Sequence, residues 1–150
     1  MTDADFDDNC IFCSIARGRT DVSIVDEDEH TVAFMDIRPV QPGHTLVIPR
    51  RHTPLLRDLD DALLQQLWRS AMRVYHALRS SDLRMDALNV MVADGAAAGQ
   101  EVAHAHVHLV PRTRGDGFGF RFPPGYGAMP PRAQLDVLAT RIRGALPGRR

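Results

Sequence analysis

Three histidines at every second position are the side chains in this sequence with the clearest chemical potential. His104, His106 and His108 alternate with apolar residues. Alternation at period two predicts a half-buried strand, with the apolar side chains facing a core and the imidazoles projecting together from the opposite face. Imidazole titrates near neutral pH and serves as a nucleophile or as a general acid or base. The pattern therefore predicts a reactive strand, and phosphoryl chemistry suits a row of three such rings.

The spacing of these histidines argues against one metal ion bound by all three. Side chains two apart on a strand stand about 6.6 to 7 Å from each other, and side chains four apart stand about 13 Å from each other. His104 and His108 are therefore too far apart to ligate the same ion. Two of the rings could chelate a metal, but the third would still need another role.

A loop of small residues precedes the histidines, from Gly95 through three alanines to Gly99 and Gln100. Small residues let backbone N–H groups approach an anion closely, and the Gln100 amide adds a further donor. We therefore expect a phosphate group between this loop and the imidazoles. The alternative is an ordinary tight turn that leads into a strand whose histidines are merely exposed.

The run from His104 to Val110, H-A-H-V-H-L-V, resembles the signature of the histidine-triad family of nucleotidyl hydrolases and transferases, in which three histidines alternate with apolar residues. The resemblance implies an α+β fold, in which one long helix packs on a face of an antiparallel sheet, and it implies a homodimer. The similarity covers about residues 10–118, and its further segments are Cys10-x-x-Cys13 and residues 33–39, 42–52 and 98–102.

The resemblance also implies a reaction. The middle histidine, His106, would attack the α-phosphorus of a purine nucleotide derivative and form a covalent nucleotidyl-histidine that water then resolves. His108 and Gln100 would contact the phosphate, and Asp36 would bind the ribose hydroxyls. A carboxylate suits a diol, and an apolar enclosure suits a purine base. The nucleotide-binding residues that the resemblance implies are Ile11, Phe12, Ile15, Phe34, Asp36, Ile37, Gly99, Gln100, Glu101 and His108.

Cys10 and Cys13 are the only cysteines of the chain. A C-x-x-C pair can be half of a zinc site, a redox pair or two small buried thiols, and the βαβ pattern that favours a redox pair is missing. The resemblance supplies His52 and His104 as two further ligands, which would give a structural zinc site of two cysteines and two histidines. In that case His104 leaves the chemistry and anchors the catalytic strand, and no organic cofactor is implied.

Two positions depart from the family pattern and bear on the substrate. Ala93 stands where many relatives have an asparagine, which removes a polar contact, and Glu101 stands where one branch often has a serine that assists the leaving group. A carboxylate there acts as a general acid only if its pKa is raised, and otherwise it repels phosphate. Three functions therefore stay open: a hydrolase of nucleoside phosphoramidates or acyl adenylates, which we favour; a dinucleoside polyphosphate hydrolase; and a nucleotide-binding or adaptor protein with little turnover.

Composition and charge exclude other classes of protein. The chain has 150 residues, 44% of them hydrophobic, and a formal net charge of −1, which predicts one compact domain over residues 10–150 and argues against binding to nucleic acid. All 18 basic residues are arginines, and this excludes mechanisms that need a lysine amine. Residues 1–9 are expected to form a disordered acidic tail, and with neither a signal-peptide core nor a membrane-spanning run we expect a cytoplasmic protein.

The remaining pattern predicts the elements that position these residues. A long helix over residues 59–78, capped by Asp58, shows apolar residues at helical spacing and is expected to cover the sheet. Near the end, residues 113–130 are expected to form an irregular loop and residues 131–146 a terminal helix. Besides the histidine strand, the expected strands are residues 22–25, 31–34, 44–49 and 87–93.

Overall fold

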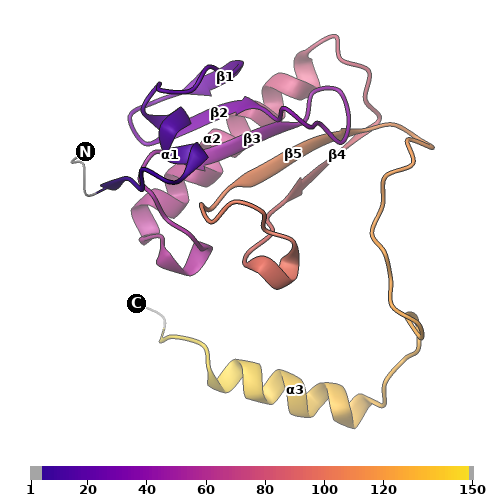
Figure 1. Ribbon diagram of the computed structural model, residues 1–150. Helices are drawn as coiled ribbons and strands as arrows, with labels where there is room; N and C mark the ends of the chain where they lie inside the picture. The colour runs from indigo at the N-terminus through magenta and orange to yellow at the C-terminus, as the bar shows by residue number, and fades with distance from the viewer. Residues whose placement is uncertain (1–4, 149–150) are drawn as a thin grey trace. The chain divides into compact units, whose positions relative to one another are not determined.

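A five-stranded antiparallel sheet in the order β1-β2-β3-β5-β4 carries the histidine motif (Figure 1). The structure is a computed structural model that describes residues 5–148. Its sheet and helices confirm the predicted α+β fold. The strands are β1 (Ile24–Glu27), β2 (Thr31–Met35), β3 (Thr45–Pro49), β4 (Ala87–Met91) and β5 (Val107–Arg112).

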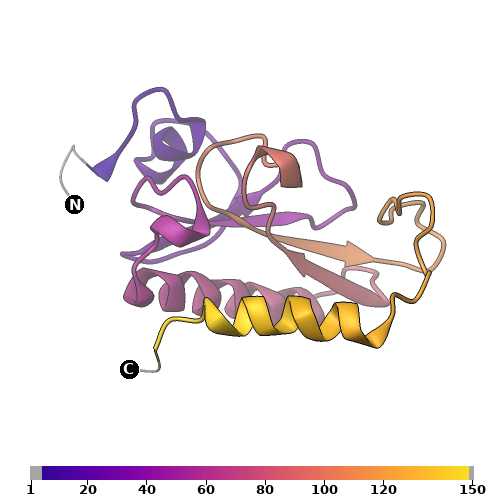
Figure 2. The same ribbon diagram turned by 90° about the horizontal axis from the view of Figure 1, so that it is seen from below.

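Both faces of the sheet are covered by other elements. Figure 2 shows the short helix α1 (Ile11–Ala16) and the 3-10 turn η3 (Ala96–Ala98) on one side of the sheet, and the long helix α2 (Asp61–Ser80) on the other. As a result every residue of the central strand β3 is buried. Burying one such Val, Leu, Ile or Phe side chain contributes roughly 1.5–3 kcal/mol to stability.

The helix α2 packs one apolar stripe on the sheet. Leu67, Ala71, Val74 and Leu78 recur every three or four residues and are buried against β2, β3 and β5. The side chain of Asp60 accepts the backbone N–H of Leu63 at 2.8 Å and caps the helix.

The start of α2 lies two residues beyond the predicted start. Residues Leu56–Asp58 form a separate 3-10 turn, η2, in which the Asp58 carboxylate accepts the backbone N–H of Leu55 at 3.2 Å. Asp58 therefore caps the turn and not the long helix. None of the helices within residues 5–148 combines the length and apolar character needed to cross a bilayer.

The strand β5 is shorter at its start than the alternating pattern predicts. It begins at Val107, so His104, in a bend, and His106 precede it, and the N–H of Ala105 between them donates to the carbonyl of Thr53 at 2.6 Å. The face that carries the imidazoles is also more buried than a half-buried strand implies, because His104 is 0% exposed and His106 is 5% exposed. The helix α1 accounts for this burial, since the Phe12 ring packs edge-on against both imidazoles.

Residues 5–9 are tied to the sheet, which differs from the disordered tail predicted for residues 1–9. Phe6 packs against the core cluster around α1, and the Arg17 guanidinium lies 4.8 Å from its ring centroid. The backbone N–H of Asp7 donates to Cys13 Sγ at 3.3 Å. The apolar ring of Phe6 holds this segment to the core despite its acidic neighbours, and residues 1–4 of the predicted tail lie outside the described residues.

The chain divides into two compact units, one ending at Phe118 and the other beginning at Gly119. In the first unit, Arg112 closes the turn after β5. Its guanidinium group donates two hydrogen bonds to the carboxylate of Asp116, each 2.7 Å long. The second unit contains α3 (Arg132–Gly144), close to the predicted terminal helix, and none of the described residues in α3 is buried. A single domain over residues 10–150 therefore stays a prediction.

Candidate functional site

The His106 ring is held in one tautomer by a backbone carbonyl. Nδ1 of His106 lies 2.7 Å from the carbonyl oxygen of His104. Because a carbonyl oxygen only accepts, Nδ1 carries the proton of the neutral ring, and the lone pair is on Nε2. His106 therefore has a free nucleophilic nitrogen.

The His108 ring is oriented by another histidine, His44, at the start of β3. The backbone N–H of Val40 donates to Nδ1 of His44 at 3.3 Å, so the proton of the neutral His44 ring is on Nε2. That nitrogen lies 3.0 Å from Nδ1 of His108 and donates to it. His108 in turn carries its proton on Nε2, which can donate to a phosphate oxygen.

Burial keeps these rings neutral. It lowers the pKa of His106, and it lowers the pKa of His108 to about 4, with help from the neighbouring His106 and His44. Burial also lowers the pKa of His44, although the Asp36 carboxylate opposes this. The ring centroids of His106 and His108 lie 4.7 Å apart. Near neutral pH the pair thus combines a lone pair on one ring with an N–H donor on the next.

The Asp36 carboxylate lies beside this pair. Its Oδ2 atom is 3.4 Å from Nδ1 of His44, and its Oδ1 atom accepts the backbone N–H of Arg38 at 2.7 Å. The second bond fixes the turn after β2, which follows from the short polar side chain at the strand end. Asp36 is thus near the histidines, as a residue that binds ribose beside the α-phosphate would need to be.

The small-residue loop satisfies most of its own hydrogen bonds. The N–H groups of Ala98 and Gln100 donate to the carbonyl of Gly95, at 3.0 and 3.3 Å, and the N–H of Gly99 donates to Ala96. Gly95 and Gly99 have φ angles of 95° and 90°, which favour glycine. The loop therefore resembles an ordinary tight turn, which was the alternative, more than a loop whose backbone N–H groups are available to bind a phosphate.

The side chain of Gln100 also differs from the prediction of a phosphate donor. Its Oε1 atom accepts the N–H of Gly95 at 2.8 Å, and its Nε2 atom donates to the carbonyl of Pro54 at 2.8 Å. The amide holds the loop and is directed at protein groups.

Glu101 is paired with a cation across the site. Its Oε2 atom lies 2.6 Å from a guanidinium nitrogen of Arg38, and both side chains are exposed. The positive charge of Arg38 offsets the repulsion that the Glu101 carboxylate would exert on a phosphate.

The apolar residues expected around the base fall into two groups. Ile11 and Ile37 are exposed, with 48% and 84% of their surface accessible. Phe12, Ile15 and Phe34 are buried in the core cluster beneath them. Only the first two therefore present free surface, while the other three form the layer that supports α1 and β2.

Four side chains from three distant segments converge next to the histidine motif. Nδ1 of His104 lies 3.5 Å from Cys10 Sγ and 3.7 Å from Cys13 Sγ, and Nδ1 of His52 lies 3.2 Å from Cys13 Sγ. The four ligand atoms all lie within 4.8 Å of one another. These are the residues proposed as zinc ligands from the sequence.

The donor set fits a tetrahedral zinc ion. With zinc–sulfur bonds of about 2.3 Å and zinc–nitrogen bonds of about 2.0 Å, a tetrahedron has sulfur–nitrogen edges of roughly 3.6 Å, close to the separations in the cluster. Nε2 of His104 donates to the carbonyl of Pro49 at 2.8 Å, so the lone pair of this ring is on Nδ1 and faces the thiols. Burial lowers the pKa of His104 to about 4 and raises the pKa of Cys13 to about 11.

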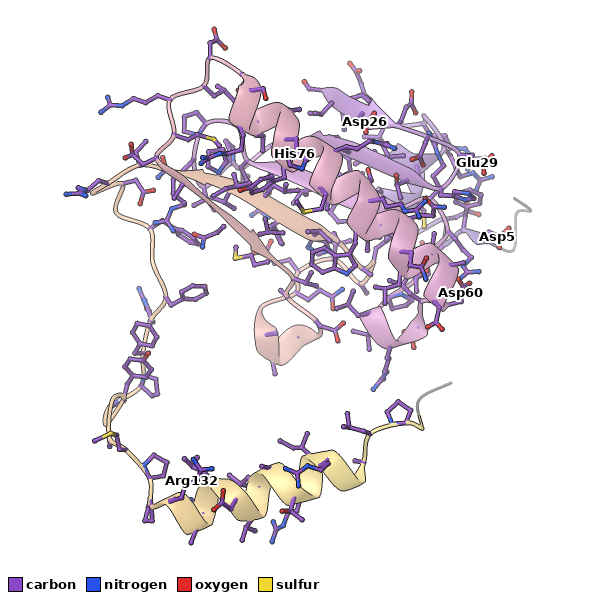
Figure 3. All side chains as sticks on the ribbon, turned by 180° about the vertical axis from the view of Figure 1, so that it is seen from behind. Asp5, Asp26, Glu29, Asp60, His76 and Arg132 are labelled. Carbon is purple, nitrogen blue, oxygen red and sulfur yellow. The ribbon has the colours of Figure 1, made fainter. Side chains whose placement is uncertain are left out.

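Two other histidines lie away from both clusters. His76 is on the outward side of α2 (Figure 3), and His30 contacts the Glu29 carboxylate at 2.7 Å. His44, which the sequence indicates only as a strand-edge or hydrogen-bonding residue beside a turn, is the residue that orients His108. Its position directly after Gly43 gave no local signal, because its partner His108 lies 64 residues further along the chain.

Comparison with known sequences identifies a family. A family model described as HIT domain matches residues 17–115. A Bacillus subtilis protein named Protein hit is 42% identical over 113 residues, which cover 75% of this chain and 77% of that protein. An uncharacterized HIT-like protein from Borreliella burgdorferi is 40% identical over 114 residues, covering 75% of this chain and 82% of that protein.

Solved structures show the same fold. A HIT family protein from Bacillus subtilis superposes with a TM-score of 0.84 at 36% identity, over 95% of this chain and 100% of that one. A zinc-bound histidine triad family protein from Mycobacterium smegmatis has a TM-score of 0.70 at 35% identity, over 92% and 98% of the two chains. A histidine triad nucleotide-binding protein from Candida albicans has a TM-score of 0.79 at 26% identity, over 91% and 96%. From its sequence, its fold and its three histidines, this chain belongs to the histidine-triad, or HIT, family.

Proposed function

We propose that the protein is a nucleotidyl hydrolase that cleaves the α-phosphate linkage of purine nucleotide derivatives, namely nucleoside phosphoramidates or acyl adenylates, through a covalent nucleotidyl-His106 intermediate. The observation that carries this proposal is the bond from Nδ1–H of His106 to the carbonyl of His104, 2.7 Å long, which leaves the lone pair on Nε2. A neutral, buried imidazole in this tautomer is a nucleophile near neutral pH.

In the first step Nε2 of His106 forms a bond to the α-phosphorus, and the bond from phosphorus to the leaving group breaks. The leaving group takes that electron pair and a proton from water. The ring gains positive charge, and the His104 carbonyl at Nδ1 is placed to stabilise it. In the second step water attacks the phosphorus, and the nitrogen–phosphorus bond breaks with its electron pair returning to Nε2 of His106. The proton that this water releases neutralises the hydroxide left by the first step, and a nucleoside monophosphate is the product.

His108 would hold the charge that develops on the phosphate. Its Nε2–H faces outward because His44 donates to its other nitrogen at 3.0 Å. The low pKa of His108, about 4, makes it a hydrogen-bond donor in its neutral form and not a cation near neutral pH. Asp36 would bind the ribose hydroxyls, and Ile11 and Ile37 would contact the base from the exposed surface beside it.

Cys10, Cys13, His52 and His104 would hold a zinc ion, a proposal that the zinc-bound relative from Mycobacterium smegmatis supports. When bound, zinc supplies a structural cross-link between these segments. His104 connects this cluster to the nucleophile, because its Nδ1 atom faces the thiols and its carbonyl accepts the Nδ1–H of His106.

A second candidate function is hydrolysis of dinucleoside polyphosphates. The contact of 2.6 Å between Arg38 and Glu101 favours it, because Arg38 neutralises the carboxylate next to the phosphate loop. An exposed ion pair of this kind is worth roughly 0–1 kcal/mol, so Arg38 can leave Glu101 for a phosphate at small cost.

The test is release of AMP from adenosine phosphoramidate and from a diadenosine polyphosphate by the wild type and by His106→Ala. We expect turnover by the wild type, its loss in the variant, and an acid-quenched adduct of one nucleotidyl group on the peptide that contains His106. His76→Ala, which removes an exposed histidine of α2, is the matched control.

The preferred substrate separates the two hydrolase functions. Turnover that persists in His106→Ala, or an adduct on another residue, would reject His106 as the nucleophile. Binding of AMP by a wild type that turns over neither substrate would favour the nucleotide-binding or adaptor function.

A further inference from the structure

The side-chain amide of Gln100 joins three segments of the chain. Oε1 accepts the N–H of Gly95 at 2.8 Å, which closes the small-residue loop. Nε2 donates to the carbonyl of Pro54 at 2.8 Å and to the carbonyl of His104 at 3.5 Å. The loop is thereby connected both to the segment after β3 and to the residue that carries the metal-site ring of the histidine motif.

These bonds use the donors of the amide completely. A primary amide has two N–H groups, and both point at carbonyl oxygens. The reverse orientation would set Oε1 against those two carbonyls and the NH2 group against the N–H of Gly95, so the hydrogen-bond partners fix which atom is which. What remains is a lone pair on Oε1, which cannot bond to a phosphate oxygen because both are acceptors.

The carbonyl of His104 is shared between Gln100 and the nucleophile. It accepts Nδ1–H of His106 at 2.7 Å as well as the amide of Gln100. The His104 ring is fixed on its other side, where Nε2 donates to the carbonyl of Pro49 at 2.8 Å. Gln100 is thus one bond away from the group that sets the tautomer of His106.

We propose that Gln100 is a positioning residue that holds the His104 carbonyl and the Gly95–Gly99 loop, and through them orients His106, and that it is not a phosphate ligand. This inference rests on the proposed function for the role of His106, and it departs from the phosphate contact that the family resemblance implies. It assigns the amide a role in the protein before any nucleotide binds.

The proposal predicts that loss of the amide lowers the rate of catalysis and leaves the affinity for nucleotide almost unchanged. Without the amide, the His104 carbonyl loses its contact with Gln100, and its peptide group is held on one side only, where the N–H of Ala105 donates to the carbonyl of Thr53 at 2.6 Å. The acceptor of the His106 Nδ1–H bond is then positioned less tightly. A misplacement of about 1 Å costs on the order of 100-fold in rate. Affinity for the nucleotide changes little, because base and ribose contacts are made elsewhere.

The experiment compares the wild type with Gln100→Met, which keeps the length of the side chain and removes both donors and the acceptor. In protein labelled with 15N-histidine and free of nucleotide, we expect the Nδ1–H signal of His106 to broaden or disappear in the variant. We also expect faster amide exchange at Gly95, a fall in kcat of about 10-fold or more, and a KM within about threefold of the wild type.

Two further variants keep the result interpretable. Gln65→Met, on the exposed side of α2, is the matched control and should leave the His106 signal unchanged. Gln100→Glu retains an acceptor for Gly95 but loses both donors. It should therefore disturb His106 while the Gly95 amide keeps its protection, and it tests the proposal if Gln100→Met fails to fold.

Two results together would overturn the proposal in favour of a direct phosphate contact. The nucleotide-free spectra of Gln100→Met and Gln100→Glu would match the wild type, and the affinity of these variants for AMP would be weakened about 10-fold or more. A wild type that turns over neither substrate would reject the proposed function, but the His106 spectra would still decide whether Gln100 positions that ring.

Discussion

Nε2 of His44 donates to Nδ1 of His108 across 3.0 Å, and this bond joins the start of β3 to β5, its neighbour in the sheet. His44 is almost fully buried, whereas His108 keeps part of its surface accessible. The bond therefore runs from the interior toward the site, and it directs the other nitrogen of His108 outward.

We expect His44→Leu to lower kcat about 10-fold or more, because His108 loses the donor that sets its tautomer. His44→Gln places an amide N–H near the position of Nε2 and should recover most of the rate. Kinetics of AMP release by both variants, with circular dichroism to show that they fold, provide the test. Equal loss in the two variants would show that His44 acts by packing alone.

Removal of one metal-site ligand should lower zinc retention. The wild type is expected to hold about one zinc per chain, and Cys13→Ser and His52→Ala are expected to lose it during dialysis. The control is His30→Ala, since that ring contacts Glu29 and lies outside the cluster. Elemental analysis of the purified proteins measures the outcome. A wild type without zinc that does not retain added zinc would reject the site.

Acid should destabilise the metal-free protein through its buried imidazoles. Burial lowers the pKa of His108 from 6.5 to about 4, so between these values the unfolded chain binds a proton that the folded chain does not. The stabilisation that neutral His108 contributes to the free energy of unfolding is fully present above pH 6.5. It decreases as the pH drops toward about 4 and changes no further below that.

Urea unfolding in the presence of a chelator, repeated across this pH range, measures the effect. His108→Gln removes one titrating ring and should reduce the dependence on pH, while His104, whose pKa burial also lowers to about 4, keeps part of it. An identical slope in the variant and the wild type would mean that other groups cause the acid sensitivity.

A side chain at Gly43 is expected to destabilise the fold. Its φ is 89°, and an added Cβ would lie 2.9 Å from Leu83 Cδ1 and 3.0 Å from Pro111 Cγ. Backbone strain and overpacking together predict a loss of about 2–4 kcal/mol for Gly43→Ala. Gly18→Ala is the matched control, because Gly18 has a φ of 67° with nothing within 4 Å of an added Cβ, so only the strain of about 1–2 kcal/mol applies.

Thermal or urea unfolding of the two glycine variants checks this difference. Since Gly43 directly precedes His44, the more damaging substitution should also reduce AMP release. Similar stabilities of the two variants would show that Leu83 and Pro111 move aside without cost.

The sequence predicted those parts of the molecule that depend on local pattern. Alternation around Val107 correctly predicted that Ala105, Val107 and Leu109 face a core, and the helical spacing of apolar residues predicted the helix that covers the sheet. The convergence of Cys10 with the distant His104 came from the family resemblance and not from the spacing.

The parts that were missed depend on partners far along the chain. The alternating pattern cannot show that Phe12 of α1 packs on the rings of His104 and His106, so the segment was predicted to be a half-buried strand. In the same way, the sequence cannot show that the amide of Gln100 donates to the carbonyl of Pro54, which lies 46 residues earlier in the sequence.

The residues of the metal site are also far apart in the order of synthesis. Cys13 precedes His52 by 39 residues, and Cys10 precedes His104 by 94. In a growing chain the two thiols therefore leave the ribosome long before their last partner exists, and until then they are exposed as a neighbouring pair. A disulfide formed between them in that interval would prevent His104 from completing the cluster. The yield of correctly folded protein should accordingly depend on reducing conditions during translation, and much less on the conditions in which the finished protein is kept.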